Sequence, residues 1–291
     1  MKANNKEVVN IHLHFFTWIL HFFKIFFIQY WSTASEVTVS TWYLGLANSM
    51  ASIIVASLAP FLGAIADKAS VKKKLLILFA YIGVISTGSL SMVSQGQWKI
   101  AIIFYVAASI GFMSANIFYD SLLPSVAPKE KREFVSSLGY ALGYIGGAIL
   151  FLINVTMYLN PQFYGITDAP TAIKLSFLTV AIWWAVFSIP VIIFIKEPTV
   201  QNDIGVLRSI KMGMSQLITT FQSIRELKIV TTFLIAYWLY IDGVDTMIRM
   251  SVDYGTSLGF SSSSFPIGLY LICLMSTTDI DNSNRLKITW E

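Results

Sequence analysis

Stretches of about 20 mostly apolar residues recur along this 291-residue chain and limit its fold more than any other feature. A helix of that length crosses the hydrocarbon core of a bilayer, where lipid offers no partner to an unpaired backbone group. The chain is 55% hydrophobic and 12% charged, whereas about a quarter of the residues of a soluble domain are charged. The sequence therefore predicts an all-α, polytopic membrane protein. Seven spans are expected: Ile11–Trp31, Trp42–Ala66, Leu75–Ser94, Trp98–Tyr119, Phe134–Met157, Ile173–Ile195 and Ile229–Met250.

Basic residues occur in alternate loops, and this alternation orients the predicted spans. The loops after the second, fourth and sixth spans contain four, three and five Lys or Arg residues. On the other side only Lys99, Lys174 and Arg249 lie near the loops. Because basic loops stay in the cytoplasm, the N-terminus and the lysine-rich loop after the second span are predicted to be cytoplasmic.

The long basic link after the sixth span is the clearest domain boundary. It contains apolar residues at steps of three and four, which predict an amphipathic helix. The eighth apolar run, Phe265–Met275, would form a helix of about 16 Å, half the hydrocarbon core, so we expect the chain to be truncated or altered there. The predicted units are a six-helix bundle at 1–195, a linker at 196–228, the start of a second bundle at 229–276 and a polar tail at 277–291.

The fifth predicted span contains glycines spaced to lie along one helix face. Gly139, Gly143 and Gly147 are four residues apart, and Gly146 lies beside them. Such a groove allows close backbone contact with a neighbouring helix. For a single glycine tight packing is the simpler explanation, whereas the full set favours a helix that also moves.

The seventh span contains three ionisable residues on one face, Asp242, Asp245 and Arg249. Ionisable groups inside a membrane commonly face a wet cavity and serve a substrate or a proton. The structural alternative is a pair near the outer end, with Arg249 extended to the interface. Asn116 and Asn154 also lie inside spans, where hydrogen bonding between helices is the commoner role and lining a cavity the rarer one.

Other classes of function lack the patterns they require. The basic residues lie in particular loops, so the net charge of +4 does not indicate nucleic-acid binding. The single cysteine excludes an intramolecular disulfide and a cysteine-based metal site. The sequence contains no nucleotide-binding loop, metal-ligand cluster or nucleophile–base set. We therefore expect no enzyme activity, cofactor, metal or nucleic-acid partner.

The loop after the second span resembles the cytoplasmic gating motif of the major facilitator superfamily. The resemblance lies in the pattern Gly-x-x-x-Asp-Lys followed by basic residues, and it departs from the motif at Ser70 and Val71. Four further stretches resemble the branch that includes the fungal vacuolar amino-acid effluxer and its bacterial homologues: WYLGLANSMASIIVASLAPFLGAIAD, NIFYDSLLPSVA, FVSSLGYALGYIGGAIL and YIDGVDTMIRM. The gate residues carried over are Gly63, Asp67, Lys68 and Lys72.

This resemblance implies two six-helix bundles with a substrate bound between them, of which the chain supplies the first bundle and the start of the second. The implied function is secondary transport of a small solute, with amino-acid efflux as the branch suggests, in a cell membrane or in a fungal vacuolar membrane. The fourth span has no arginine of the proton-coupling kind, so proton antiport is not carried over. The alternatives are a truncated, non-transporting membrane remnant, or a structural partner of another membrane protein such as a second half-transporter.

Overall fold

A computed structural model describes most of the predicted six-helix region and little of the chain beyond it. The predicted first span is described only in part, and the predicted seventh span only at its beginning. The chain divides into two compact units, Met1–Thr231 and Thr232–Glu291, and the predicted domain boundaries stay predictions. The described residues are 23, 27–31, 37–69, 71–195, 211, 215, 218–219, 228–240 and 243.

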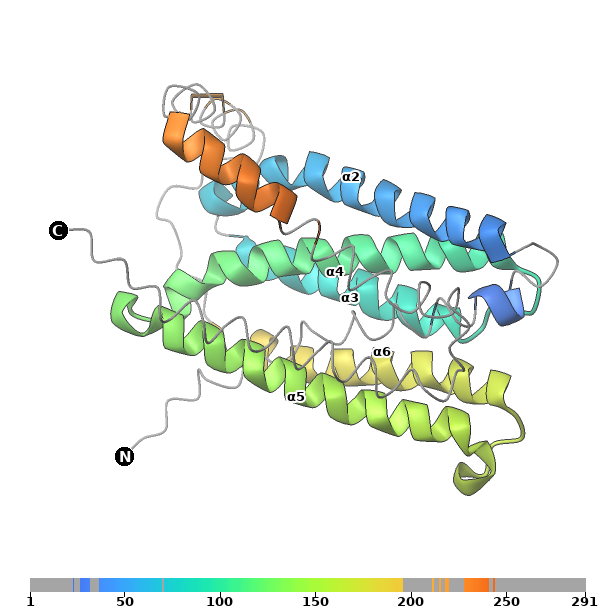
Figure 1. Ribbon diagram of the computed structural model, residues 1–291. Helices are drawn as coiled ribbons and strands as arrows, with labels where there is room; N and C mark the ends of the chain where they lie inside the picture. Colours follow the sequence, from blue (N-terminus) through green and yellow to red (C-terminus); the bar gives the residue numbers. More distant parts are fainter. Residues whose placement is uncertain are drawn as a thin grey trace, which may run out of the picture. The chain divides into compact units, whose positions relative to one another are not determined.

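Five long α-helices form the described part of the first unit (Figure 1). All five are long and apolar enough to cross a membrane, and no strand occurs among the residues that the structure describes. The all-α membrane fold predicted from the sequence is therefore confirmed. A shorter apolar helix covers Lys228–Tyr240. The long helices are α2 (Val37–Ala69), α3 (Lys72–Leu90), α4 (Trp98–Val126), α5 (Arg132–Leu159) and α6 (Ala169–Phe194).

Most helix ends differ by a few residues from the predicted spans, and two of these differences have a clear physical cause. α3 ends at Leu90 rather than Ser94, because the chain turns there and Gly96 takes a left-handed conformation at φ 79°. α4 continues to Val126, beyond the predicted span end at Tyr119, and Pro124 lies inside it. A proline removes one backbone hydrogen bond without always ending the helix, since neighbouring groups in a membrane protein can compensate.

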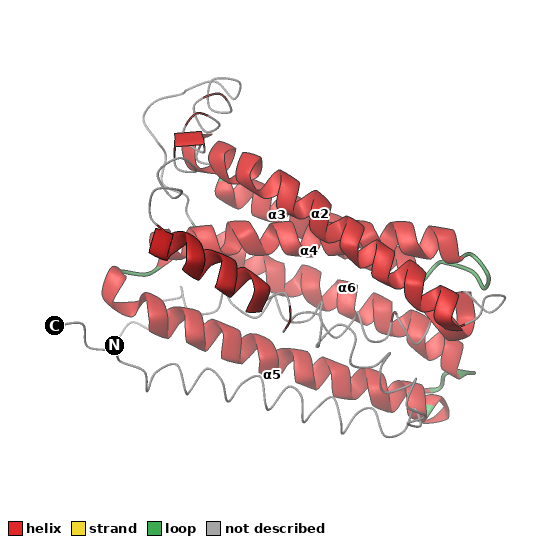
Figure 2. Ribbon diagram, turned by 45° about the horizontal axis from the view of Figure 1, so that its top comes forward, coloured by secondary structure: helices red, strands yellow, loops and turns green. Residues whose placement is uncertain are grey.

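The helices of the first unit pack in the order α2, α4, α3, α6 and α5 (Figures 1 and 2). α4 lies between α2 and α3, α3 contacts α6, and α6 contacts α5. Many large apolar side chains on these helices are exposed, including Trp42, Ile53 and Ile182. In a membrane protein such residues face lipid, which is as apolar as they are.

The end of the predicted first span is the most deeply buried described part of the chain. Phe23, Phe27 and Trp31 are fully buried. Residues Phe27–Trp31 form a short π-helix. The ring of Phe23 stacks on Tyr105 of α4 at 4.1 Å, and that of Trp31 stacks on Phe177 of α6 at 5.7 Å. Aromatic packing therefore fixes this segment inside the bundle.

The closest helix contact is made by two glycines and a tryptophan. A Cβ added to Gly111 of α4 would lie 2.6 Å from the backbone nitrogen of Gly83 on α3. A Cβ added to Gly83 would lie 2.2 Å from the ring of Trp184 on α6. Three helices thus meet where only glycine leaves enough room. We refer to Gly83, Gly111 and Trp184 as the glycine–tryptophan contact.

Candidate functional site

Two lysines of the predicted gate loop contact backbone carbonyls at the ends of neighbouring helices. The Lys73 Nζ donates a hydrogen bond to the carbonyl oxygen of Ile192 on α6, at 2.7 Å. The Lys72 Nζ donates to the carbonyl of Ser121 on α4, at 3.5 Å. Both α4 and α6 end within a few residues of these carbonyls. A cation is favoured at a helix C-terminus, where carbonyl groups lack partners within the helix.

These contacts give the lysine loop a structural role in addition to its effect on topology. The start of α3 is joined to the ends of α4 and α6 at one end of the bundle. Lys74, the next residue, is exposed. The loop therefore contains two lysines turned toward the bundle and a third on its surface.

The other gate residues are described less completely. Gly63 is half-buried in α2, and a Cβ added to it would meet nothing within 4 Å, so packing alone does not require glycine there. The side chains of Asp67 and Lys68 lie outside the described residues. A gate formed by Gly63, Asp67, Lys68 and Lys72 therefore stays a prediction.

The four glycines of α5 share one buried face. Gly139, Gly143, Gly146 and Gly147 are all buried, whereas Ile145 on the opposite side is 58% exposed. The same buried face continues through Leu150, Asn154 and Met157. The spacing seen in the sequence thus falls on a buried face, and both the predicted groove and its proposed role in movement stay predictions.

Asn154 lies on this face and contacts α6. Its side chain is 1% exposed, and its Oδ1 accepts a hydrogen bond from the Thr179 hydroxyl at 3.0 Å. The same hydroxyl lies 2.9 Å from the carbonyl oxygen of Ser176. The Asn154 Nδ2 has no hydrogen-bond partner in the described part of the chain. Asn154 thus joins two helices, as the commoner interpretation of such a residue predicts.

In Asn116 of α4 the amide oxygen lacks a partner among the described residues, whereas in Asn154 it is the amide nitrogen. The Asn116 side chain is half-buried, and its Oδ1 is enclosed by protein without a partner among the described residues. A buried acceptor without a partner costs free energy, on the order of 1–3 kcal/mol. Neither Asn116 nor Asn154 lines a described cavity large enough for a solute.

A polar contact near the middle of the membrane was missed in the sequence. The Tyr105 hydroxyl of α4 donates a 2.7 Å hydrogen bond to the Oδ1 of Asn48 on α2. Tyr105 is 1% exposed, and its ring stacks on Phe23. Asn48 is half-buried. In the sequence, Asn48 appears as a single carboxamide side chain inside an apolar run. Asn116 and Asn154 were singled out by the same feature.

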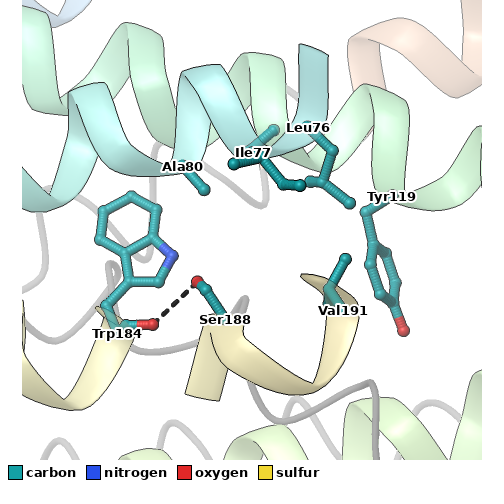
Figure 3. Close-up of a pocket in the computed structure, with 8 residues that line it drawn as sticks. Leu76, Ile77, Ala80, Tyr119, Trp184, Ser188 and Val191 are labelled. Carbon is teal, nitrogen blue, oxygen red and sulfur yellow. Dashed lines mark hydrogen bonds between the residues drawn. The ribbon is translucent and has the colours of Figure 1, made fainter. Parts of the chain in front are cut away.

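The structure contains a small cavity between α3, α4 and α6 (Figure 3). It offers about 20 Å³ to a water molecule, room for roughly one. The Ser188 hydroxyl beside it donates a hydrogen bond to the carbonyl oxygen of Trp184 at 2.8 Å. A cavity of this size is a packing space and cannot hold an organic solute. Its lining residues are Leu76, Ile77, Ala80, Ala115, Tyr119, Trp184, Ser188 and Val191.

The remaining predicted pathway residues lie beyond the described part of the chain. Asp242, Asp245 and Arg249 are outside it, whereas Gly243 is described as helical and exposed. Within the described residues, no group of three or more His, Cys, Asp or Glu side chains is arranged to hold a metal ion.

Comparison with known proteins identifies the family. The sequence model of the family described as vacuole effluxer Atg22 like matches residues 30–279. The chain belongs to the Atg22-like family. The family match includes the four glycines of α5, the lysine-rich loop and the Asn48–Tyr105 contact. It places the chain in the branch of membrane proteins that the sequence resemblance indicated.

Individual relatives of the Atg22-like chain come from bacteria and fungi. An uncharacterized MFS-type transporter, YxiO of Bacillus subtilis, is 39% identical over 259 residues, which cover 85% of this chain and 58% of the relative. An uncharacterized protein of Aquifex aeolicus is 24% identical, over 73% of this chain and 51% of the relative. Autophagy-related protein 22 of Saccharomyces cerevisiae is 22% identical, over 73% of this chain and 45% of the relative.

The chain thus spans about half the length of the curated relatives that it matches. No solved structure matches it. The Atg22-like family and the apolar helices together establish a membrane location. The matches to named transporters are consistent with a role other than that of an enzyme.

Proposed function

We propose that this protein is a secondary transporter of the major facilitator type that moves a small solute across a membrane by alternating access. The observation behind this proposal is the family match over residues 30–279, together with 39% identity to a relative named as an MFS-type transporter. Alternating access requires bundles that rock against each other around a central site. The described helices provide one packed bundle of the required kind.

The proposal assigns three roles within the chain. Gly63, Asp67, Lys68 and Lys72 would close the pathway at the cytoplasmic end. The buried glycine face of α5 would let that helix slide against its neighbour. The pathway would be lined by polar side chains that include Asn116, Asp242 and Asp245.

The chemical nature of the solute and the location of the protein are finer parts of the proposal. Amino acids are the proposed solutes, as the sequence resemblance implies, and efflux is the proposed direction, because the matching family is described as vacuole effluxer Atg22 like. The proposed orientation has the N-terminus and the lysine loop in the cytoplasm, as the alternating basic loops predict. A cell membrane is the proposed location, or a vacuolar membrane if the host is a fungus.

Flux measured with purified protein tests the proposal. The complete chain would be reconstituted in liposomes loaded with a mixture of the twenty radiolabelled amino acids, and their release would be followed over time. We expect release of at least one amino acid to exceed that from protein-free liposomes. The proposal is rejected if folded, inserted protein releases none of the twenty and a solute panel extended to organic acids and amines also gives no flux.

A second candidate function is transport only within an assembly. The matched regions cover 58% or less of these relatives. A complete pathway would therefore need additional helices. These could come from polypeptide beyond the matched region, from a second copy of the chain or from another membrane protein. Chemical crosslinking in native membranes would distinguish the two cases. Flux from crosslink-free, monomeric protein favours the first, whereas flux found only in a crosslinked complex favours the second.

A further inference from the structure

The side chain of Asn48 combines a fixed orientation with an unused donor. Tyr105 donates to the Asn48 Oδ1 at 2.7 Å, which occupies the acceptor end of the amide. The only hydrogen bond of the Asn48 side chain within the described part of the chain is the one at its Oδ1, and the residue is half-buried, whereas Asn154 is 1% exposed. An asparagine amide nitrogen carries two donor hydrogens. The contact therefore leaves a donor group available on a half-buried side chain.

The depth of Asn48 makes an available donor unusual. The residue lies nine positions after Val39, where the apolar span of α2 begins. Nine residues of helix measure about 14 Å, close to the middle of a hydrocarbon core of about 30 Å. A donor that faced lipid at this depth would lose its hydrogen bonds with water and gain none. Such a group is stable where it meets water or a polar solute.

The neighbours of Asn48 on α2 show that it does not belong to the lipid-facing side. Ala47 and Ala51 are buried at 1% and 0% exposure, whereas Met50 and Ile53 are 49% and 65% exposed. Asn48 thus lies at the border of the buried stripe rather than within the exposed one. Its partner Tyr105 is held in turn by the stacked ring of Phe23.

We infer that Asn48 is a solute-binding residue whose amide nitrogen donates a hydrogen bond to an acceptor oxygen of the transported solute, with Tyr105 as the positioning residue. The solute atom that fits is a carboxylate or carbonyl oxygen. The Asn48 Oδ1 already accepts a hydrogen bond from Tyr105, so the group left for the solute is the Nδ2 donor. This inference rests on the proposed transport function. It adds a contact that the family match does not assign and that involves none of the predicted gate or pathway residues.

The first test asks whether position 48 faces water. Cys273 is the only cysteine, so a Cys273→Ser background allows single cysteines to be added. A maleimide reacts with thiolate, which forms in water and not in lipid. We expect the maleimide to label the Asn48→Cys variant in proteoliposomes and to leave the Ile53→Cys variant, on the exposed face of the same helix, and the buried Ala51→Cys variant unlabelled. Equal labelling of the Asn48→Cys and Ile53→Cys variants would overturn the inference.

The second test asks which chemical group of the solute lies beside position 48, because the Asn48→Cys variant has no amide of its own and reports proximity alone. The twenty amino acids would first be screened for one that slows labelling of the Asn48→Cys variant. The protection given by this amino acid would then be compared with that given by two analogues, one lacking the carboxylate and one lacking the amine. For leucine these analogues are 3-methylbutylamine and 4-methylpentanoate. We expect the compounds with a carboxylate to protect the cysteine and the amine alone to leave it reactive. Protection by the amine alone, or by none of the twenty, rejects the donor role.

Transport kinetics separate a binding role from a structural one. The Asn48→Leu variant should raise the solute concentration for half-maximal flux by up to about tenfold, the equivalent of one hydrogen bond, with the maximal flux retained. The Tyr105→Phe variant keeps the ring on Phe23 and should give a smaller increase. A fall in maximal flux with unchanged half-saturation would contradict the inference. Flux without protection rejects the inference alone, whereas protection without flux rejects the proposed function.

Discussion

The two sides of α4 make different kinds of contact. Toward α3 and α6, Gly111 belongs to the glycine–tryptophan contact, which is apolar and leaves no room for a methyl group. Toward α2, Tyr105 instead forms a hydrogen bond with the Oδ1 of the half-buried Asn48. Close packing holds helices together in lipid, where burial of apolar surface gains little. The difference indicates that α4 has a fixed side and a side on which polar groups can exchange partners.

The largest expected effect comes from breaking the fixed side. In the Gly111→Ala variant the added methyl group meets the backbone of α3, which cannot move away as a side chain can. Overpacking of this kind costs typically about 1–3 kcal/mol. We expect a clearly lower midpoint in a thermal unfolding scan of the purified protein in detergent.

Two further variants make the same test specific. The Gly45→Ala change adds a methyl group where nothing lies within 4 Å, and it should leave the midpoint equal or higher. The Gly83→Ala variant clashes with the Trp184 ring, so a second change of Trp184→Leu should restore part of its stability. The same second change should not rescue Gly111→Ala. Equal rescue of both variants by Trp184→Leu would show that Gly83 and Gly111 contact the same partner.

The glycine–tryptophan contact also shows what the sequence could not predict. The number of helices and the membrane class can be predicted from the apolar runs. Each run forms a helix whose backbone hydrogen bonds lie within that helix, so this property is local in sequence. Gly83 and Gly111 belong to different spans and have no neighbouring glycine at a helical spacing, so nothing in the sequence pairs them. The four glycines of α5 form a periodic pattern, which the sequence shows directly, and all four are buried. Contacts between spans depend on helix order and rotation, which local patterns do not specify.

The second expected effect comes from breaking the polar side of α4. In the Tyr105→Phe variant the ring keeps its position on Phe23, and the hydrogen bond to Asn48 is lost. Hydrogen bonds between membrane helices contribute about 0.6 kcal/mol on average. We expect a loss of that size in an unfolding titration in detergent, smaller than the loss for Gly111→Ala. A larger loss than that of Gly111→Ala would reverse the assignment of the fixed and exchangeable sides.

The third prediction concerns how the ends of α4 and α6 are held. Lys73 lies closer to its carbonyl partner than Lys72 does, at 2.7 Å against 3.5 Å. Removing a cation from a helix C-terminus costs about 0.5 kcal/mol at low ionic strength. We expect the Lys73→Met variant to lose about this amount, Lys72→Met less, and the exposed Lys74→Met none. Unfolding scans at low and high salt provide the measurement, because salt should remove the difference. Equal losses for Lys73 and Lys74 would count against the carbonyl contacts.

The same lysines show which part of the site the sequence did predict. Their predicted position in a cytoplasmic loop rests on charge alone, and the proposed gate motif rests on a short pattern. The carbonyl partners could not be inferred, because a backbone group leaves no mark in the sequence. Asn48 was missed for a different reason: one carboxamide inside an apolar run does not reveal whether it packs, lines a cavity or binds. Only its contact with Tyr105, 57 residues further along the chain, distinguishes it from Asn154.

The smallest expected effect concerns the N-terminus of α6, which lies at the opposite end of this helix from the carbonyl that Lys73 contacts. Asp168 begins this helix, and its Oδ1 accepts a 2.8 Å hydrogen bond from the Thr171 backbone nitrogen. Hydrogen bonds from Thr171, with a further contribution from the charge of Lys174, hold the pKa of Asp168 below its ordinary value of 3.8. A carboxylate whose pKa is lowered by folding stabilises the protein above the ordinary pKa and loses this effect as the pH falls through the folded value.

Substitution of this cap should therefore have a pH-dependent effect. We expect Asp168→Ala to lower the unfolding midpoint slightly at pH 7, and the difference from the parent protein to shrink as the pH falls below the ordinary pKa of Asp168. Asp168→Asn is the matched control, because its amide oxygen can still cap the helix and does not titrate. A difference between parent and Asp168→Ala that stays constant from pH 7 to pH 3 would show that the charge is not what stabilises this end. The two ends of α6 would then differ in kind, since only the lysine-bound end would depend on an ionised side chain.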